Sequence, residues 1–400
     1  MAKLDSIFDS FSEKNIFKDK SILQTNYTPE TIPHRDEQVE SVASILAPAL
    51  RGERVSNLFV YGKTGTGKTL SVQYVANELL KRADSSDNKL RVVYVNCKLK
   101  KIADTEYRIL AELVNQLGGS VPSTGLPTDA VYNKFVEIIE REQQGILIIL
   151  DEIDQAVRKI SDGFLYSLTR LNVELKKSHI SLVGISNSLT FMDELDPRVR
   201  SSLGEEELVF APYNALQLQD ILKERSKMAF QEGVLEEGVI AKCAGYAARE
   251  HGDARRALDL LRVAGELAER NSSKKVGLIH LDEANRKIER DKMLDIIENE
   301  PKQFQLVLFS IMNLSEKYKN ASIFTGEIYS NYQDICSRTK NEALTQRRVS
   351  DILAEFDMLG LINAQVISKG RQGRTREIKL MIPQQLLPKA REILNSSLSL

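Results

Sequence analysis

The chain has 400 residues, 42% of them hydrophobic and 28% charged, a composition typical of a globular protein with two or three domains. It contains no run of roughly 18 apolar residues and no apolar segment near its start, so we expect neither a membrane span nor a secretory signal. The net charge of −1 excludes a polycation, so a nucleic-acid site would have to be a local patch. The three cysteines are far apart and lack the spacing of metal ligands, which predicts free thiols in a reducing cytoplasm.

Residues 1–212 alternate short apolar runs with segments of helical periodicity. The apolar runs are NLFV at 57–60, RVVYVNC at 91–97, ILIIL at 146–150 and SLVGIS at 181–186. Buried strands that alternate with helices are typical of a parallel sheet with helices on both faces. We therefore predict an α/β domain over residues 1–212.

The remainder of the chain predicts two further domains. After Pro212 and Tyr213 the apolar runs stop, and residues 213–300 show only helical periodicity, which predicts an all-α domain. Residues 301–400 form a third unit, with helices followed by two short strands around a basic, glycine-containing turn. Its helices are expected near 303–318, 325–337 and 345–359.

The first apolar run leads into a glycine-rich loop, Gly62-Lys63-Thr64-Gly65-Thr66-Gly67-Lys68-Thr69, and then into a helix from Leu70. The loop matches G-x-x-x-x-G-K-[ST] in full and stands between a strand and a helix, as such a loop requires. Its glycines let backbone N–H groups point at phosphate oxygens, and the start of the helix adds a positive dipole. The expected nucleotide is ATP or ADP. Lys68 is expected to meet its β phosphate and, in ATP, the γ phosphate, and the Thr69 hydroxyl to bind Mg²⁺. This context disfavours the alternative, a flexible loop without a ligand.

Polar side chains end two later strands. Asp151 and Glu152 follow the run ILIIL, and Asn187 follows the run SLVGIS. A carboxylate at the end of a buried strand is costly unless it meets a cation, so Asp151 is predicted to hold Mg²⁺ and Glu152 to polarise the attacking water. Asn187 is predicted to contact the γ-phosphate or to position that water. The alternatives are helix capping for the two acids and an ordinary turn for Asn187.

A helix in the all-α domain has arginines in its first turn. Asp253 is the predicted N-cap of the helix that opens with Ala254-Arg255-Arg256. Arginine is poorly placed at the positive end of a helix dipole, so Arg255 or Arg256 is predicted to face an anion. Solvated arginines are the alternative.

Residues 345–361 predict an amphipathic helix followed by a basic hairpin. The exposed first turn, where a recognition helix presents side chains to the major groove of DNA, contains Thr345, Gln346, Arg347 and Arg348. The hairpin contains Lys369, Arg371, Arg374 and Arg376. Its glycines let the turn approach a phosphate backbone closely. We predict that both segments bind double-stranded DNA; a solvated basic loop is the alternative for the hairpin.

Together, these motifs resemble the AAA+ superfamily of ATPases. The glycine-rich loop, the run LDEID, Asn187 and Arg255 match its Walker A, Walker B, sensor 1 and sensor 2 motifs. More narrowly, the chain resembles the archaeal replication initiators related to the origin recognition complex and to the cell division control protein 6 helicase loader. This resemblance covers residues 26–383 in the family's order and rests on YGKTGTGKT, ILDEID, GISN, LDPRVRSSLGEEELVF and GDARRALDLLR.

The resemblance implies the fold and further site residues. It implies an α/β AAA+ P-loop ATPase core with a parallel sheet at 1–212, an all-α lid at 213–300 and a C-terminal winged-helix domain at 301–400. Arg198 or Arg200 matches the arginine finger that reaches the ATP of a neighbouring subunit. The residues that match nucleotide-binding positions of the family are Tyr27, Pro33, His34, Arg35, Tyr213 and Arg225.

The resemblance also implies a function: a cytoplasmic, nucleoid-associated DNA replication initiator that uses ATP and Mg²⁺ to recognise double-stranded origin DNA. It further implies slow, regulatory ATP hydrolysis, recruitment of the replicative helicase, and paralogous initiator subunits as partners, with no membrane partner. One alternative is another AAA+ machine, such as a clamp-loader subunit or a branch-migration motor. Sequence-specific duplex binding by residues 301–400 would argue against it. The other alternative is a transcription regulator that only senses ATP. ATP-dependent recruitment of the helicase would argue against this second alternative.

Overall fold

The computed structural model describes residues 16–25, 27–29, 31–84, 88–98, 105–122, 124–318, 323–368 and 374–398. The chain folds into two compact units, Met1–Leu281 and Asp282–Leu400. The predicted boundaries at residues 212 and 300 divide the chain more finely and stay predictions. Among the described residues, no helix is long and apolar enough to cross a membrane.

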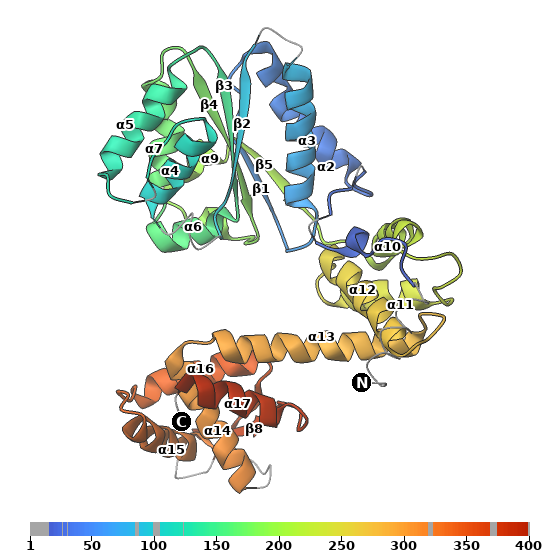
Figure 1. The fold of residues 1–400 in the computed structure, drawn as a ribbon. Helices are drawn as coiled ribbons and strands as arrows, with labels where there is room; N and C mark the ends of the chain where they lie inside the picture. Colours follow the sequence, from blue (N-terminus) through green and yellow to red (C-terminus); the bar gives the residue numbers. More distant parts are fainter. Residues whose placement is uncertain are drawn as a thin grey trace, which may run out of the picture. The chain divides into compact units, whose positions relative to one another are not determined.

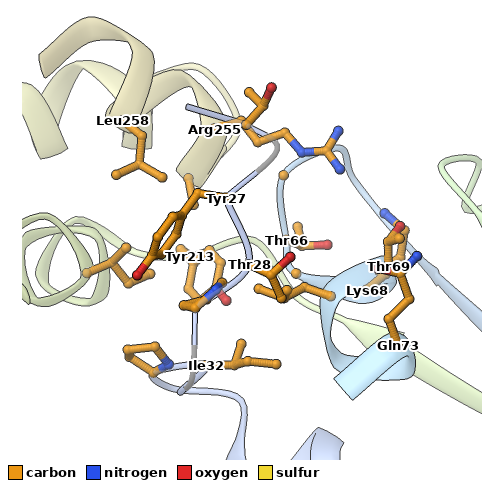
Figure 2. A pocket seen from close by; sticks show the side chains of 18 of the residues that line it. Tyr27, Thr28, Ile32, Thr66, Lys68, Thr69, Gln73, Tyr213, Arg255 and Leu258 are labelled. Atoms are coloured by element: carbon orange, nitrogen blue, oxygen red, sulfur yellow. The ribbon is translucent and has the colours of Figure 1, made fainter. Parts of the chain in front are cut away.

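The first unit is built on a five-stranded parallel sheet with the strand order β2-β3-β4-β1-β5. Its strands are β1 (Leu58–Gly62), β2 (Leu90–Asn96), β3 (Gly145–Asp151), β4 (His179–Ser186) and β5 (Glu206–Phe210). Every residue of β3 is buried, as expected for a central parallel strand covered on both faces. The register places Asn96 opposite Asp151 and Asp151 opposite Ile185, so the carboxyl ends of these strands meet at one edge of the sheet. The cavity drawn in Figure 2 is lined by residues from this edge.

Strand β5 is the strand that the apolar runs of the sequence do not predict. It lies at one side of the sheet, next to β1. An edge strand buries less of its surface than a central strand, so it tolerates the exposed acids Glu206 and Glu207. The short, uninterrupted apolar run that identifies the central strands is therefore absent from the sequence of β5.

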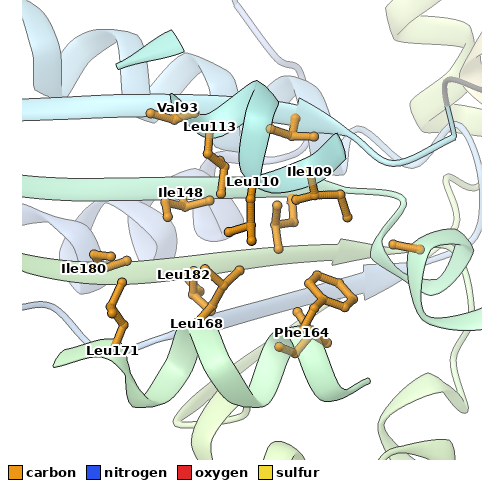
Figure 3. Packing of buried hydrophobic residues seen from close by; sticks show 14 of the residues in the cluster. Val93, Ile109, Leu110, Leu113, Ile148, Phe164, Leu168, Leu171, Ile180 and Leu182 are labelled. Atoms are coloured by element: carbon orange, nitrogen blue, oxygen red, sulfur yellow. The ribbon is translucent and has the colours of Figure 1, made fainter. Parts of the chain in front are cut away.

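Helices cover both faces of the sheet (Figure 1). The first face is covered by α2 (Asp36–Leu46) and α3 (Lys68–Ala83), and by the 3-10 turn η2 (Ala47–Arg51). The second face is covered by α4 (Glu106–Gln116), α5 (Thr128–Ile139), α6 (Ile153–Ile160), α7 (Gly163–Arg170), η3 (Leu171–Val173), α8 (Phe191–Glu194) and α9 (Pro197–Leu203). Figure 3 shows this second core, in which Ile109 and Leu113 of α4 and Leu168 of α7 lie against strand residues such as Ile148 and Leu182. The two apolar layers hold the carboxyl edge of the sheet in a fixed geometry.

The first unit also contains a helical part, which we call the lid. Its helices are α10 (Ala215–Ala229), α11 (Val239–Arg249), α12 (Ala254–Arg270) and the start of α13 (Leu278–Asn299). Helix α10 begins with a capping box, in which the Asn214 side chain accepts from the Gln217 N–H and the Gln217 side chain accepts from the Asn214 N–H. Helix α12 begins after Asp253, whose carboxylate accepts from the backbone N–H groups of Arg255 and Arg256, as predicted for its N-cap.

The N-terminal segment, by which we mean the described residues 16–25, 27–29 and 31–33, packs on the lid. It includes the 3-10 turn η1 (Lys20–Leu23), with Ile22 and Leu23 buried. Phe17 forms a bridge with Phe230 at the end of α10, and the Lys18 N–H donates to the Ala229 carbonyl at 2.8 Å. Lys20 and Glu266 of α12 form an ion pair at 2.5 Å. The segment is therefore anchored to two lid helices.

The second unit combines helices with a small antiparallel sheet of order β6-β8-β7. Its elements are the end of α13, α14 (Lys302–Lys317), β6 (Ile323–Phe324), α15 (Thr325–Arg338), α16 (Gln346–Met358), β7 (Ile362–Ser368), β8 (Arg374–Leu380) and α17 (Leu387–Leu398). Val349, Ile352, Leu353 and Phe356 of α16 are buried in its core, which confirms the predicted amphipathic helix. The winged-helix arrangement predicted for this region is confirmed, with β6 and α17 as additions.

Candidate functional site

Residues 62–69, which run from the last residue of β1 into the first turn of α3, form the P-loop of this site. Gly65 and Gly67 have φ values of +71° and +90°, in the left-handed region that favours glycine. Helix α3 begins at Lys68, so its unpaired N-terminal N–H groups and the positive end of its dipole lie at the edge of the cavity. Residues 65–70 line the cavity, whereas Gly62, Lys63 and Thr64 do not.

Lys68 is the central cation of the site. Its Nζ donates to the carbonyl oxygens of Gly62 and Lys63, at 2.9 and 2.8 Å, and to Asn187 Oδ1 at 2.9 Å. Burial lowers the pKa of Lys68 to about 8, with Asp151 opposing this shift and Arg255 adding to it. These three hydrogen-bond acceptors are all neutral, so an anion nearby would stabilise the charge of the ammonium group.

The predicted metal ligands lie side by side. Thr69 Oγ1 donates to Asp151 Oδ2 at 2.9 Å, which joins the start of α3 to the end of β3. The Tyr94 hydroxyl donates to the same oxygen at 2.7 Å, and burial, with Asp151 next to it, raises the pKa of Tyr94. Glu152 follows with φ of +53°, and its carboxylate lies 3.7 Å from Lys98 Nζ. Four oxygen-bearing side chains thus line one edge of the cavity, and Tyr94 is the one of these that motif matching does not identify.

Asn187 is held next to the P-loop by a buried acid. Asp154 is 3% exposed, and its Oδ1 accepts from Ser186 Oγ at 2.9 Å and from the Asn187 N–H at 3.4 Å. Its other oxygen accepts from the Gln155 side chain at 3.0 Å. In the sequence, Asp154 stands out only as part of the run LDEID. Its contact with β4 is long-range, so the local pattern does not reveal this supporting role.

The lid reaches the P-loop through the start of α12. The Ala254 N–H donates to the Gly65 carbonyl at 3.2 Å. A Cβ on Gly65 would lie 1.7 Å from Asp253 Oδ1, so only glycine allows this approach. Arg255 lines the cavity, and Figure 2 shows its side chain extending toward the P-loop. Arg256 instead forms an ion pair with Glu250 at 3.1 Å, so the structure separates the two candidate arginines.

The cavity has a volume of about 560 Å³ and a second end away from the P-loop. Tyr27, Pro33, Tyr213 and Arg225 line it, and the Arg225 guanidinium lies 4.3 Å from the Tyr27 ring centroid. Residues of this end that sequence analysis does not identify include Thr28, Ile32, Ile221, Met228 and Leu258. They share no motif, and only the packing of the N-terminal segment on the lid brings them together.

His34 and Arg35 do not line this cavity. Arg35 is 4% exposed; its Nε donates to the Thr66 carbonyl at 2.8 Å and its Nη2 to the Ala211 carbonyl at 2.5 Å. Its guanidinium also lies 4.0 Å from the Tyr213 ring centroid. His34 Nε2 lies 3.3 Å from a carboxylate oxygen of Asp220 on α10. Arg35 therefore ties the P-loop to the chain that leads into the lid.

Arg198 and Arg200 lie on α9, outside the cavity lining. Arg198 Nε is 3.0 Å from Asp196, and its guanidinium lies 5.3 Å from the Tyr166 ring centroid. Arg200 Nη1 is 3.0 Å from Asp193. The side chains are 71% and 52% exposed. Both are exposed enough to meet a second molecule, and the choice between them stays open.

In the second unit, Thr345 caps α16 by accepting from the Arg348 N–H. Thr345, Gln346, Arg347 and Arg348 are exposed. The Arg376 guanidinium on β8 donates to the Ser350 carbonyl at 3.1 Å, which joins the hairpin to this helix. Lys369, Arg371 and the side chain of Arg374 lie outside the described residues. The predicted first turn of α16 is therefore a cationic surface open to a ligand.

Three family models match consecutive parts of the chain. They are an AAA domain at residues 52–192, a Cdc6 AAA+ ATPase-type lid domain at 219–286 and a CDC6 C-terminal winged helix domain at 295–390. The match to all three follows the order of the core, the lid and the second unit.

Whole-length relatives agree with these models. The chain is 52% identical over 384 residues to an ORC1-type DNA replication protein of Thermococcus onnurineus, covering 95% of this chain and 92% of the relative. It is also 52% identical over 384 residues to one of Pyrococcus abyssi, covering 95% of this chain and 91% of the relative. Its fold matches the solved Aeropyrum pernix ORC1 protein in complex with DNA, with a TM-score of 0.83 and 44% identity over 96% of this chain and 98% of that one.

Proposed function

Because the chain belongs to the Orc1/Cdc6 family of AAA+ DNA replication proteins, we propose that it binds origin DNA under the control of ATP and helps to recruit the replicative helicase. The observation that supports this most is the meeting of the P-loop, Asp151, Asn187 and Arg255 at one cavity of a chain that also has a winged helix. The proposed localisation is the cytoplasm, at the nucleoid.

ATP or ADP is the proposed occupant of the cavity. The P-loop N–H groups and Lys68 bind the phosphates, and Arg255 contacts them from the lid. The residues at the other end, including Tyr27, Tyr213 and Arg225, enclose the nucleobase. The cavity of about 560 Å³ lies within the range of roughly 300–1,000 Å³ typical of ligand sites.

The oxygen groups of Thr69 and Asp151 fit a bound Mg²⁺. They lie 2.9 Å apart beside the P-loop, and hydroxyl and carboxylate oxygens are the ligands that this cation prefers. The described residues contain no group of three or more His, Cys, Asp or Glu side chains that could hold a metal ion. This suits a cation that binds through one or two protein oxygens and the phosphates of its nucleotide. When bound, Mg²⁺ would supply positive charge at the β and γ phosphates.

Hydrolysis in this proposal is slow and acts as a switch. Glu152 accepts the proton of the attacking water, and Asn187 positions that water or contacts the γ-phosphate. Arg198 or Arg200 reaches the ATP of a neighbouring initiator subunit, which their exposure on α9 supports. Paralogous subunits are the proposed neighbours.

DNA binding is assigned to the second unit. The exposed first turn of α16 presents Gln346 and Arg347 to base edges in the major groove, and the basic hairpin grips the phosphate backbone. The Aeropyrum pernix relative was solved in complex with DNA, which supports DNA binding by this chain. The hydrogen bond from Arg376 to α16 gives the hairpin a fixed relation to that helix.

The pH dependence of nucleotide affinity tests the role of Lys68. Because its pKa is about 8 in the nucleotide-free protein, Lys68 is charged below pH 8 and neutral above it. Bound phosphates favour the charged form, so binding above pH 8 takes up a proton. The ADP affinity measured by calorimetry should be nearly constant around pH 7, fall about twofold by pH 8 and then weaken further, approaching roughly tenfold per pH unit. A Lys68→Arg variant that still binds ADP should lose this dependence, and an unchanged affinity of the natural protein at pH 9.5 would contradict the assignment.

Genome-wide footprinting tests the function as a whole. We expect the protein to occupy replication start sites, with an occupancy that changes between the ATP- and ADP-bound forms. Purified helicase should then be retained on origin DNA only when the protein and ATP are present. Occupancy of promoters without helicase retention would identify a transcription regulator instead, and the absence of sequence-specific duplex binding would favour another AAA+ machine.

A further inference from the structure

Tyr94 on β2 places a hydroxyl group beside the residues proposed to bind Mg²⁺, although no motif includes it. Its ring packs in the apolar layer between the sheet and α3. Its hydroxyl leaves that layer, lines the cavity and donates to Asp151 Oδ2 at 2.7 Å. A phenylalanine would fill the same apolar space, so packing alone does not require the hydroxyl.

The Tyr94 hydroxyl hydrogen-bonds one oxygen of the proposed metal-binding carboxylate, Asp151 Oδ2. Asp151 Oδ2 accepts from both Thr69 Oγ1 and Tyr94, while Asp151 Oδ1 accepts from the Glu152 N–H at 2.9 Å. The carboxylate is therefore held at both oxygens, and it cannot rotate without breaking hydrogen bonds. Hydrogen bonds to a metal-binding carboxylate orient it and tune its affinity.

The backbone of Tyr94 is itself fixed at the edge of the sheet. Strand β2 is an edge strand, so the N–H and carbonyl that face away from β3 need other partners. Gln116 of α4 supplies both: its Oε1 accepts from the Tyr94 N–H at 3.2 Å, and its Nε2 donates to the Tyr94 carbonyl at 2.9 Å. The backbone at Tyr94 is thus held by Gln116 on one side and by the pairing of β2 with β3 on the other.

We propose that Tyr94 is a positioning residue of the metal site, whose hydroxyl holds the Asp151 carboxylate in the orientation that binds Mg²⁺. This inference rests on the proposed roles of Asp151 and Thr69. Tyr94 would act through Asp151, and Gln116 would hold the backbone of Tyr94 in place.

The test is Tyr94→Phe, which removes one oxygen and keeps the ring. ATP affinity of nucleotide-free full-length protein is measured in EDTA and across a Mg²⁺ titration. We expect an unchanged affinity in EDTA, an unchanged thermal midpoint, and a half-saturating Mg²⁺ concentration raised on the order of tenfold. Tyr61→Phe is the matched control, because Tyr61 lies on β1, separated from β2 by two strands and outside the cavity lining, and its hydroxyl donates to Glu207 at 3.3 Å. This control should leave the Mg²⁺ dependence unaltered.

The outcomes separate the inference from the function on which it rests. If the natural protein shows no Mg²⁺ dependence of ATP affinity, the metal site itself is wrong. If it does, and Tyr94→Phe has the same half-saturating concentration, the positioning role alone is overturned. A lower half-saturating concentration would also overturn it, because the hydroxyl would then compete with the cation for Asp151.

Discussion

Replacing Glu152 with glutamine is expected to leave ATP bound while slowing its hydrolysis on the order of 10²–10⁴-fold, the usual contribution of a positioned general base. Glu152 follows Asp151 at the carboxyl end of β3, lines the cavity, and has a side chain that is 17% exposed. An amide has nearly the same size as the carboxylate but cannot accept the proton of water. Single-turnover hydrolysis and equilibrium ATP binding, measured on the same preparation, distinguish the chemical step from affinity.

Glu137→Gln provides the matched control for this change. Glu137 lies on α5, outside the cavity lining, and forms ion pairs with Lys134 and Arg141. Its replacement should alter neither ATP affinity nor turnover. Hydrolysis at the natural rate by Glu152→Gln would show that another group accepts the proton.

The second large effect is expected from replacing Arg347 and Arg348 together with alanine. Both are exposed in the first turn of α16, and Arg348 lies 4.0 Å from Asp351. Removing an arginine that binds a base should cost about 1–3 kcal/mol on the origin duplex. Removing one that binds a phosphate should weaken binding to every duplex and reduce the log–log salt dependence by roughly one unit. Fluorescence anisotropy with origin and random duplexes across a salt series separates these two contributions.

Lys389→Ala controls for the removal of positive charge from the second unit. Lys389 is exposed on α17, away from the α16 turn and the hairpin in sequence. Its removal should leave both the affinity and the preference for origin DNA close to those of the natural protein. If the double variant also kept its affinity and preference, α16 would not be the recognition helix.

The parts predicted from the sequence are those that local patterns determine. The P-loop follows from contiguous residues, and the buried strand β3 follows from an uninterrupted apolar run, because a central parallel strand has no polar face. Strand β5 escapes the same reasoning, since its edge position permits Glu206 and Glu207. The helical lid and the helix α16 follow from periodicity, and the start of α12 follows from the predicted N-cap Asp253.

The parts that could not be predicted depend on contacts between distant segments. Tyr94 and Asp154 occupy strand and helix positions that would suit ordinary packing residues. The register of β2 with β3 brings Tyr94 to Asp151, and the contact of α6 with the end of β4 brings Asp154 to Ser186 and Asn187. Arg35 matches a nucleotide-binding position of the family, yet its guanidinium hydrogen-bonds two carbonyls of its own chain. Residue identity alone does not distinguish a side chain that lines a cavity from one that supports its wall.

The anchoring of the N-terminal segment on the lid has a kinetic consequence. The end of the cavity away from the P-loop is walled by this segment and by the lid helices α10 and α12. The segment is joined to α10 through Phe17 and Phe230, and to α12 through the Lys20–Glu266 ion pair. A nucleotide held there would touch the sheet with its phosphates and the joined segment and lid with its base. Its departure would then require the joined segment and lid to separate from the sheet, about a hinge at the two places where the chain connects them, residues 33–35 and 211–213. The residence time of the nucleotide would be governed by how rarely this hinge opens, so substitutions far from the phosphates could change it.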